Sequence, residues 1–221
     1  MKIFLDTANV ESIQKYIDLG IVDGITTNPT LLFKENNDPI EAMKKIVKLV
    51  DGPVSLEVVA TGFDEMMEES LKLAKYGDNV VVKVPMTSEG LKTVHALTKK
   101  NIKTNVTLIF SANQALLASK AGATYISPFI GRLDDIGHDG LTLISDIVQI
   151  FASYDISTQV LVASVRHPIH VIESAKLGAD VVTLPPEILQ KMMHHSLTDK
   201  GLDAFLADWE KVKKGFPNLQ F

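Results

Sequence analysis

Short apolar runs rich in β-branched residues alternate with longer amphipathic segments along the whole chain. Eight runs have the length and composition of buried strands, and each is followed by a segment whose apolar residues recur at helical spacing. We predict strands at residues 3–6, 24–27, 54–59, 80–84, 104–108, 125–128, 159–163 and 181–184. We predict helices at residues 10–19, 39–50, 64–76, 88–100, 111–121, 141–154, 168–177 and 187–194.

Capping residues and glycines mark several of these boundaries. Ser88 is predicted to cap the helix at 88–100, and Ser111 with Gln114 forms the pattern of a capping box. Glycines at positions 20, 77, 122 and 178 fall where helices should end. Strict alternation of strand and helix predicts a parallel sheet, and eight such units predict a (β/α)8 TIM barrel. A doubly wound open sheet is the alternative, although the chain has no Gly-rich dinucleotide fingerprint.

A last amphipathic segment, residues 198–214, follows the eighth unit and is predicted to form an additional C-terminal helix. Leu202, Phe205, Leu206 and Trp209 share one face of it. Because the barrel closes without this helix, it either covers the barrel floor or packs on a neighbouring subunit. No linker interrupts the chain, so we predict one domain over residues 1–221.

Composition excludes several classes of function. Net charge is -5 without a basic stripe, which argues against nucleic acid as a partner. No apolar stretch is long enough to span a membrane, and the N-terminus does not resemble a signal peptide, so a cytoplasmic protein is expected. The chain has no cysteine, which excludes disulfides and thiolate ligands, and its six histidines have no clustered acidic partner. We therefore predict no metal site.

Lys83 is the residue with the strongest chemical signal. It lies within Val80-Val81-Val82-Lys83-Val84-Pro85, a run typical of a strand buried on both faces. An ammonium group there is destabilised, which favours a lowered pKa and a free amine. A desolvated amine is what Schiff-base chemistry with a carbonyl substrate requires. The alternative is that Lys83 marks the strand end and extends to solvent.

Other polar side chains fall at the carboxyl ends of the predicted strands, where the active sites of such barrels lie. These residues are Asp6, Asn28, Glu57, Asn105, Thr107, Ser127, Arg132, Ser164 and Arg166, and the aromatic residue Phe129 lies beside Ser127 at the end of its strand. Residues two apart on a strand share a face, so Asn105 and Thr107 should point together. Each has a structural alternative: Asp6 as a cap of the first helix, Glu57 as a counter-ion of Lys83, and the arginines as surface charges.

The chain resembles the small transaldolases, a family that includes the fructose-6-phosphate aldolases. The resemblance covers nearly the whole length, in the segments Leu5-Asp6-Thr7-Ala8, Gly24-Ile25-Thr26-Thr27-Asn28-Pro29, Val82-Lys83-Val84-Pro85-Met86, Asn105-Val106-Thr107-Leu108-Ile109-Phe110-Ser111, Ser127-Pro128-Phe129-Ile130-Gly131-Arg132 and Ala163-Ser164-Val165-Arg166. It implies a (β/α)8 barrel with a Schiff-base lysine on strand four. Lys83 lies on the fourth predicted strand.

The resemblance implies four catalytic residues. Lys83 would attack a ketose carbonyl, and Asp6 would act as acid and base on the substrate hydroxyl whose deprotonation drives C–C cleavage. Glu57 and Thr107 would hold a water that relays protons. No cofactor is implied, because the iminium itself accepts the electrons.

The resemblance also implies the substrate-binding residues. Asn28 and Asn105 would bind hydroxyls of the dihydroxyacetone unit, with Ser127 beside them. Arg132, Ser164 and Arg166 would bind the phosphate, since guanidinium groups form charge-assisted hydrogen bonds to it.

Two positions separate the transferases of this family from the lyases. Lyase members carry Gln at the position of Glu57 and Tyr at the substrate-binding position of Phe129, so both residues here favour a transaldolase. The implied reaction moves dihydroxyacetone from sedoheptulose 7-phosphate to glyceraldehyde 3-phosphate, in the pentose phosphate pathway. A fructose-6-phosphate aldolase that releases free dihydroxyacetone is the alternative. The resemblance also implies a pentamer or decamer that assembles through the C-terminal helix.

Overall fold

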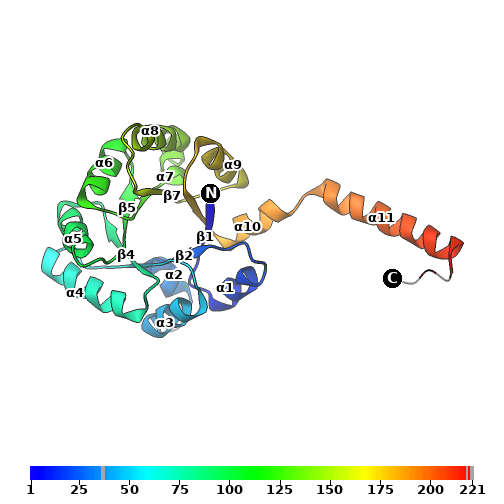
Figure 1. The fold of residues 1–221 in the computed structure, drawn as a ribbon, viewed down its shortest axis with the longest axis horizontal. Helices are drawn as coiled ribbons and strands as arrows, with labels where there is room; N and C mark the ends of the chain where they lie inside the picture. The colour runs from blue at the N-terminus through cyan, green and yellow to red at the C-terminus, as the bar shows by residue number, and fades with distance from the viewer. Residues whose placement is uncertain (36–37, 218, 220–221) are drawn as a thin grey trace.

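The computed structural model describes residues 1–35, 38–217 and 219. Eight parallel strands close into one barrel in sequence order, and the helices form an outer ring (Figure 1). The predicted (β/α)8 barrel is confirmed, and the open-sheet alternative is wrong because β1 also pairs with β8.

All eight predicted strands form, with ends shifted by a few residues. They are β1 (Lys2–Asp6), β2 (Gly24–Thr26), β3 (Val54–Glu57), β4 (Val80–Pro85), β5 (Thr104–Ile109), β6 (Tyr125–Pro128), β7 (Gln159–Val162) and β8 (Val181–Leu184). The predicted helices that follow the strands also form. They are α1 (Val10–Ile17), α3 (Pro39–Leu49), α4 (Phe63–Leu73), α5 (Ser88–Thr98), α6 (Ala112–Ala121), α8 (Gly140–Ser153), α9 (Pro168–Leu177) and α10 (Pro186–Met193).

Two short helices were not predicted. α2 (Pro29–Lys34) follows β2, and α7 (Ile130–Asp134) follows β6. Each has fewer than two turns, so neither shows a recognisable apolar period. Both begin directly after a strand, which places them at the carboxyl end of the barrel.

The observed helix ends agree with most of the predicted capping residues and differ at one. Ser111 accepts a hydrogen bond from the backbone N–H of Gln114, as expected. The cap of α5 is Thr87, not Ser88: its hydroxyl accepts from the backbone N–H of Gly90. Gly122 and Gly178 end α6 and α9 in the left-handed conformation.

Side chains that point into the barrel form a floor layer of five apolar residues. The floor layer consists of Phe4, Val81, Tyr125, Leu161 and Val181, all buried. Because side chains alternate along a strand, the next inward position on each strand lies two residues further along, nearer the carboxyl end. Those positions are mostly polar: Asp6, Lys83, Ser127, Ala163 and Thr183. The barrel is therefore sealed below by apolar contacts and carries its polar groups above.

Gly24 makes room for the largest ring of the floor layer. Phe4 pairs with Gly24 across β1 and β2, and its ring packs edge-on against Tyr125 with centroids 6.1 Å apart. A Cβ on Gly24 would lie 2.7 Å from the Phe4 ring and 2.6 Å from the backbone oxygen of Pro53. A side chain at position 24 would therefore displace the ring or the backbone.

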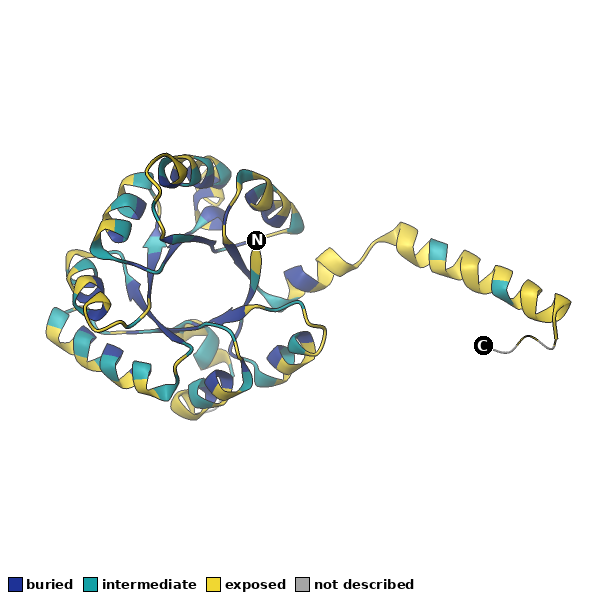
Figure 2. Ribbon diagram, viewed as in Figure 1, coloured by how far each residue is buried: buried dark blue, intermediate teal, exposed yellow. Residues whose placement is uncertain are grey.

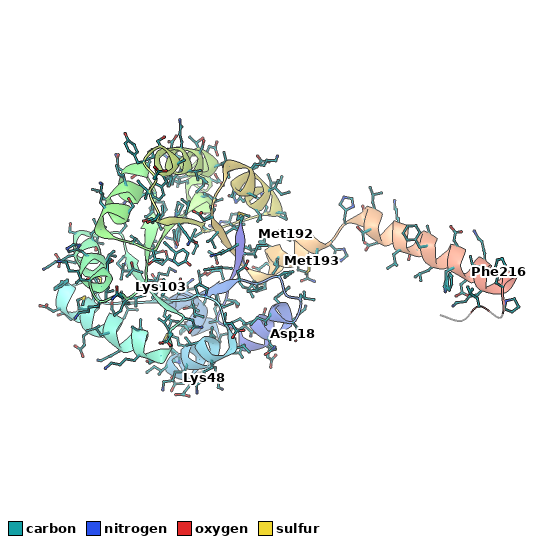
Figure 3. All side chains as sticks on the ribbon, in the orientation of Figure 1. Asp18, Lys48, Lys103, Met192, Met193 and Phe216 are labelled. Atoms are coloured by element: carbon teal, nitrogen blue, oxygen red, sulfur yellow. The ribbon has the colours of Figure 1, made fainter. Side chains whose placement is uncertain are left out.

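The C-terminal helix α11 (Ser196–Gly215) leaves the barrel and extends away from it (Figures 1 and 2). It has no buried residue, whereas the barrel strands are almost entirely buried (Figure 2). Met192 and Met193 lie where the chain leaves the barrel, and Phe216 lies at the far end of α11 (Figure 3). The predicted helix is confirmed, but it does not cover the floor of its own barrel. Within the described chain, no helix is both long and apolar enough to cross a membrane.

Gly24→Ala should lower the free energy of unfolding by about 2–3 kcal/mol, because it overpacks the barrel interior against Phe4 and a backbone oxygen. Denaturant unfolding followed by circular dichroism measures this change. Gly201→Ala is the matched control, because a Cβ there meets open space. Equal stability of the two variants would contradict the proposed tight packing at Gly24.

Candidate active site

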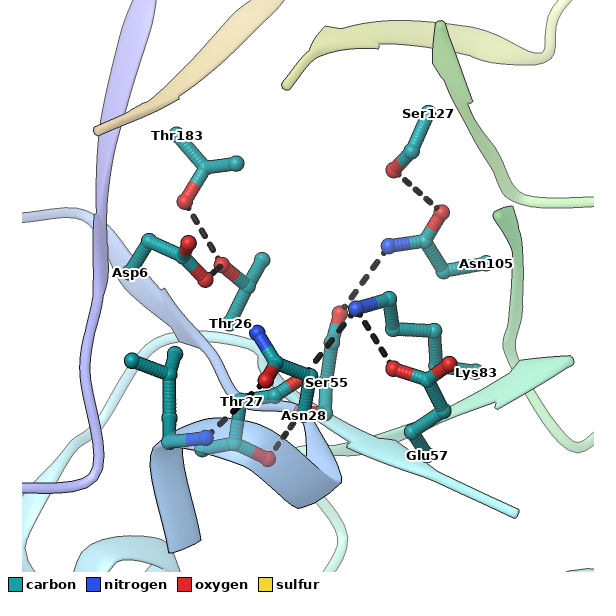
Figure 4. Close-up of polar contacts among 11 residues, drawn as sticks. Asp6, Thr26, Thr27, Asn28, Ser55, Glu57, Lys83, Asn105, Ser127 and Thr183 are labelled. Carbon is teal, nitrogen blue, oxygen red and sulfur yellow. Dashed lines mark hydrogen bonds and ion pairs between the residues drawn. The ribbon is translucent and has the colours of Figure 1, made fainter. Parts of the chain in front are cut away.

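The Lys83 side chain points into the barrel and does not extend to solvent. Its side chain is only 7% exposed, and its Nζ lies 2.8 Å from the Glu57 carboxylate (Figure 4). The amine also donates to the backbone oxygen of Thr27 at 3.1 Å. Extension of Lys83 to solvent is therefore excluded, and Glu57 does serve as its counter-ion. At 2.8 Å, Glu57 can also accept a proton from the amine directly.

Asp6 lies on the neighbouring part of the same inner surface. Its Oδ1 accepts a 2.7 Å hydrogen bond from Thr26, whose oxygen lies 2.7 Å from the Thr183 hydroxyl (Figure 4). Since Thr26 gives its one proton to Asp6, Thr183 must donate to Thr26. Asp6 does not cap the first helix; Asn9 does.

Burial raises the pKa of the Asp6 carboxyl above its ordinary value. Lys83 and the hydrogen bond from Thr26 act in the opposite direction, but desolvation is the largest effect. A carboxyl group with a raised pKa gains and loses a proton more readily near neutral pH, which suits an acid/base role.

A second polar chain crosses the barrel on the other side of Lys83. The hydroxyl of Ser127 donates to Asn105 at 2.8 Å, and the Asn105 amide donates to the Ser55 hydroxyl at 3.3 Å (Figure 4). All three residues are buried. Asn105 pairs with Lys83 across β4 and β5, so this chain lies beside the amine.

These groups surround a cavity of about 230 Å³ at the carboxyl end of the barrel, and several of them line it directly. Its lining contains eight of the predicted site residues: Asp6, Asn28, Lys83, Ser127, Phe129, Arg132, Ser164 and Arg166. Glu57 and Asn105 stay outside the lining but contact Lys83 and Ser127, respectively. Thr107 is buried, and its hydroxyl has no hydrogen-bond partner among the residues described.

The mouth of the cavity carries two arginines. The Arg132 guanidinium lies 4.9 Å from the centre of the Phe129 ring, in a cation–π contact, and Phe129 packs edge-on against Phe110. The Arg166 guanidinium lies 2.7 Å from Asp135. Two guanidinium groups at one mouth form a site for an anion, and bidentate hydrogen bonding makes phosphate a good match.

Two residues near the cavity have backbone conformations that are unfavourable without glycine. Ser164 has φ of 61° and lies in the loop that carries Arg166, and Leu108 has φ of 61° directly after Thr107. The register of β5 against β6 shifts between Val106 and Ile109, on either side of Leu108. Such strain concentrates at functional sites.

Asn28 caps a helix and also lines the cavity. Its side-chain oxygen accepts from the backbone N–H of Leu31 and so caps α2, with Pro29 at the first helical position. Its amide nitrogen has no hydrogen-bond partner among the described residues, so it can donate into the cavity that Asn28 lines.

Sequence reasoning missed three residues at the site. Thr26 and Thr183 line the cavity, and each had a detectable signal as a polar residue at an inward position of a buried strand. His170, one of the six histidines to which sequence reasoning assigned no function, is buried and bonded to Asp134 and to the backbone of Arg166. Its position at the start of α9 gave no sign of burial.

The chain is similar to known proteins over nearly its whole length. The sequence profile described as Transaldolase/Fructose-6-phosphate aldolase matches residues 3–216. A "Probable transaldolase" of Nitrosopumilus maritimus is 61% identical over 221 residues, which is 100% of both chains. Another "Probable transaldolase", of Methanococcus vannielii, is 63% identical over 95% of this chain and 98% of its own.

A solved structure supports the fold alone. Inosine 5' monophosphate dehydrogenase from Legionella pneumophila superimposes with a TM-score of 0.60 over 85% of this chain and 58% of that one, at 13% identity.

Asp6→Asn should make the folded protein more stable at neutral pH. Because the pKa of Asp6 is raised, its ionised form destabilises the fold at pH values above that pKa, and the effect disappears below the ordinary value of 3.8. The stability gain of the variant should therefore be largest near pH 7 and should vanish as the pH falls toward 3.8. Denaturant unfolding at several pH values measures it, with exposed Asp51→Asn as the control. A variant less stable than wild type at pH 7 would show that Lys83 and Thr26 outweigh desolvation.

Proposed function

The chain belongs to the transaldolase/fructose-6-phosphate aldolase family, and on this basis we propose that it is a transaldolase that forms a Schiff base through Lys83. The observation that carries the proposal is the buried Lys83 amine, 2.8 Å from Glu57, beside a cavity with Asp6 inside and two arginines at its mouth. The proposed reaction transfers dihydroxyacetone from sedoheptulose 7-phosphate to glyceraldehyde 3-phosphate. The products are erythrose 4-phosphate and fructose 6-phosphate.

The first steps join the donor to the enzyme. The Lys83 amine, after it has lost a proton to Glu57, attacks the ketose carbonyl carbon and forms a carbinolamine. Loss of the hydroxyl as water gives the iminium, and this loss requires a proton donor. Glu57 and Thr107 supply it through a water. The unpartnered Thr107 hydroxyl supports this role, since a buried hydroxyl without a protein partner is commonly satisfied by water.

The next steps break and remake the carbon–carbon bond. Asp6 removes the proton of the C4 hydroxyl, the C3–C4 bond breaks, and its electron pair moves into the iminium to give an enamine. The aldehyde product leaves. The acceptor aldehyde then takes its place, the enamine attacks its carbonyl carbon, and Asp6 returns the proton to the new hydroxyl. Hydrolysis of the iminium releases the new ketose and the free amine of Lys83.

Binding residues surround the reacting carbons. Asn28, Asn105 and Ser127 donate to hydroxyls of the dihydroxyacetone unit. At the mouth, the phosphate interacts with Arg132, Ser164 and Arg166, so that the sugar chain extends from the mouth to Lys83. The ring of Phe129 offers no hydroxyl to activate water against the enamine, and this supports transfer over hydrolysis. The protein would act in the pentose phosphate pathway in the cytoplasm, without a metal or an organic cofactor.

Borohydride reduction in the presence of fructose 6-phosphate should attach a dihydroxyacetone-derived group to Lys83. Lys83→Met should remove this adduct and lower turnover by about a thousandfold or more, because no other amine replaces the nucleophile. Peptide mass mapping identifies the labelled residue, and exposed Lys103→Met serves as the control.

Free dihydroxyacetone, assayed in a parallel reaction without borohydride and without an acceptor, separates the two activities of the family. Little release supports the transaldolase, whereas steady release would identify a fructose-6-phosphate aldolase. Absence of any adduct would exclude Schiff-base chemistry altogether.

We further propose that the protein assembles as a pentamer or decamer through α11. Leu202, Phe205 and Leu206 are each more than half exposed on this helix, although they form its apolar face. An apolar face of this kind, projecting from the barrel, is typical of a surface that another subunit covers.

Phe205→Glu combined with Leu206→Glu should convert the oligomer into monomers, because two carboxylates would be buried without partners at the interface. Light scattering coupled to size exclusion measures the mass, with Lys200→Glu, on the same helix, as the control. A monomeric wild type, or an oligomer unaffected by the double substitution, would contradict assembly through α11.

A further inference from the structure

Three contacts hold Arg166 in place. Two of them come from α7 and the residue that follows it, and the third comes from α9. Its guanidinium lies 2.7 Å from Asp135, and its backbone N–H donates to Nδ1 of His170 at 3.2 Å. Its side chain also lies against Gly131, where an added Cβ would come within 2.7 Å of the Arg166 Cγ. The position of this guanidinium is therefore set by contacts, although 51% of the side chain is exposed.

His170 connects two segments of the chain. It is only 4% exposed, and its Nε2 lies 2.9 Å from the Asp134 carboxylate. The other oxygen of Asp134 accepts from the backbone N–H of Gly140. Because Nδ1 accepts a hydrogen bond, the ring carries its proton on Nε2 and donates it to Asp134. His170 thus links the end of α7 to the loop after β7.

The neutral form of the ring suits this role. Burial lowers the pKa of His170, and the neighbouring His167 and Arg166 lower it further, while Asp134 opposes them. A protonated ring could no longer accept the hydrogen bond from Arg166.

The same two segments meet through their backbones. The N–H of Ile130 donates to the oxygen of Ala163, and the N–H of Gly131 donates to the oxygen of Ser164, both at 3.1 Å. The backbone bonds hold the start of α7 against the loop, and the His170–Asp134 pair holds its end. The short helix is therefore attached to the loop at both ends.

We propose that His170 and Asp134 are positioning residues that fix the Arg166 loop relative to α7, and so fix the distance between Arg132 and Arg166 for phosphate recognition. Arg132 lies on α7, and Arg166 lies on the loop and donates its backbone N–H to His170. This inference rests on the proposed function, because the anion bound by the arginines is taken to be the substrate phosphate. Neither His170 nor Asp134 touches the substrate in this arrangement.

A near-isosteric pair of variants tests the hydrogen bond. Asn at position 170 can present its side-chain oxygen where Nδ1 lies, whereas Leu has a similar shape and no acceptor. The readout is the KM for the acceptor at saturating sedoheptulose 7-phosphate, measured with glyceraldehyde 3-phosphate and with unphosphorylated glyceraldehyde. The two acceptors differ only in the phosphate, so the comparison isolates its binding.

His170→Leu should raise the KM for glyceraldehyde 3-phosphate about three- to tenfold, which is the effect of losing one positioning hydrogen bond. It should leave kcat and the KM for glyceraldehyde within about twofold of wild type. His170→Asn should raise the KM for glyceraldehyde 3-phosphate less than His170→Leu does, because it keeps the acceptor for the Arg166 N–H and loses only the contact with Asp134. It should leave the KM for glyceraldehyde near the wild-type value. A purely structural role would instead lower activity with both acceptors alike.

Asp134→Ala is a second variant in case His170→Leu does not fold. Its side chain is 36% exposed, so the substitution leaves no large internal cavity, and the same selective rise in KM is expected. His138→Asn, an exposed histidine in the turn between α7 and α8, is the control and should behave as wild type.

Arg166→Ala distinguishes failure of this inference from failure of the proposed function. If Arg166→Ala raises the KM for glyceraldehyde 3-phosphate but the substitutions at His170 and Asp134 do not, the positioning role is wrong and the phosphate site stands. Equal effects of Asn and Leu at position 170 would also overturn it, since the acceptor would then be irrelevant. If Arg166→Ala has no effect, the phosphate site itself is misassigned, and this inference falls with it.

Discussion

The ion pair between Lys83 and Glu57 inside the barrel is the constraint on which the rest of the site depends. An ammonium group removed from water is strongly destabilising unless an opposite charge and hydrogen bonds compensate. Here a carboxylate at 2.8 Å and a backbone oxygen at 3.1 Å provide both. The compensation holds the amine inside the barrel beside the cavity, where it can meet a substrate, instead of at the strand end in solvent. It also places next to the amine the group that can remove its proton.

The remainder of the barrel interior maintains this arrangement. The floor layer of Phe4, Val81, Tyr125, Leu161 and Val181 closes the barrel below the polar groups, so the cavity opens only at the carboxyl end. Above it, the chains from Thr183 to Asp6 and from Ser127 to Ser55 satisfy hydroxyl and amide groups through one another. Side chains held in such chains have few alternative rotamers, which keeps the cavity organised in the absence of substrate. Thr107 is an exception, because its buried hydroxyl lacks a partner in the described part of the chain.

The environment of Asp6 suits acid/base chemistry but lowers the free energy of unfolding. Its carboxyl group is desolvated enough for its pKa to rise although Lys83 lies on the same inner surface. The two strained residues, Leu108 and Ser164, add to the same effect. Destabilising features such as a desolvated carboxyl group and a strained backbone concentrate around the cavity, whereas the barrel wall is regular and apolar. The arrangement is what a catalytic site in a stable scaffold requires.

The sequence by itself determined the barrel and the placement of Lys83 on its fourth strand. A buried parallel strand has a side-chain period of two and a β-branched composition, and both can be read locally, so eight strands and a polar residue inside the fourth were detectable. Only the tertiary structure decided which side chains contact one another. The pairing of Lys83 with Glu57, the burial of His170 and the approach of Arg166 to α7 join residues far apart in the chain, and no local pattern encodes such contacts. The short helices α2 and α7 could not be predicted either, because a helix of fewer than two turns shows no recognisable spacing of apolar residues. In the same way, the spacing of Leu202, Phe205 and Leu206 predicted a helix with an apolar face, but only the fold showed that this face finds no cover on its own barrel.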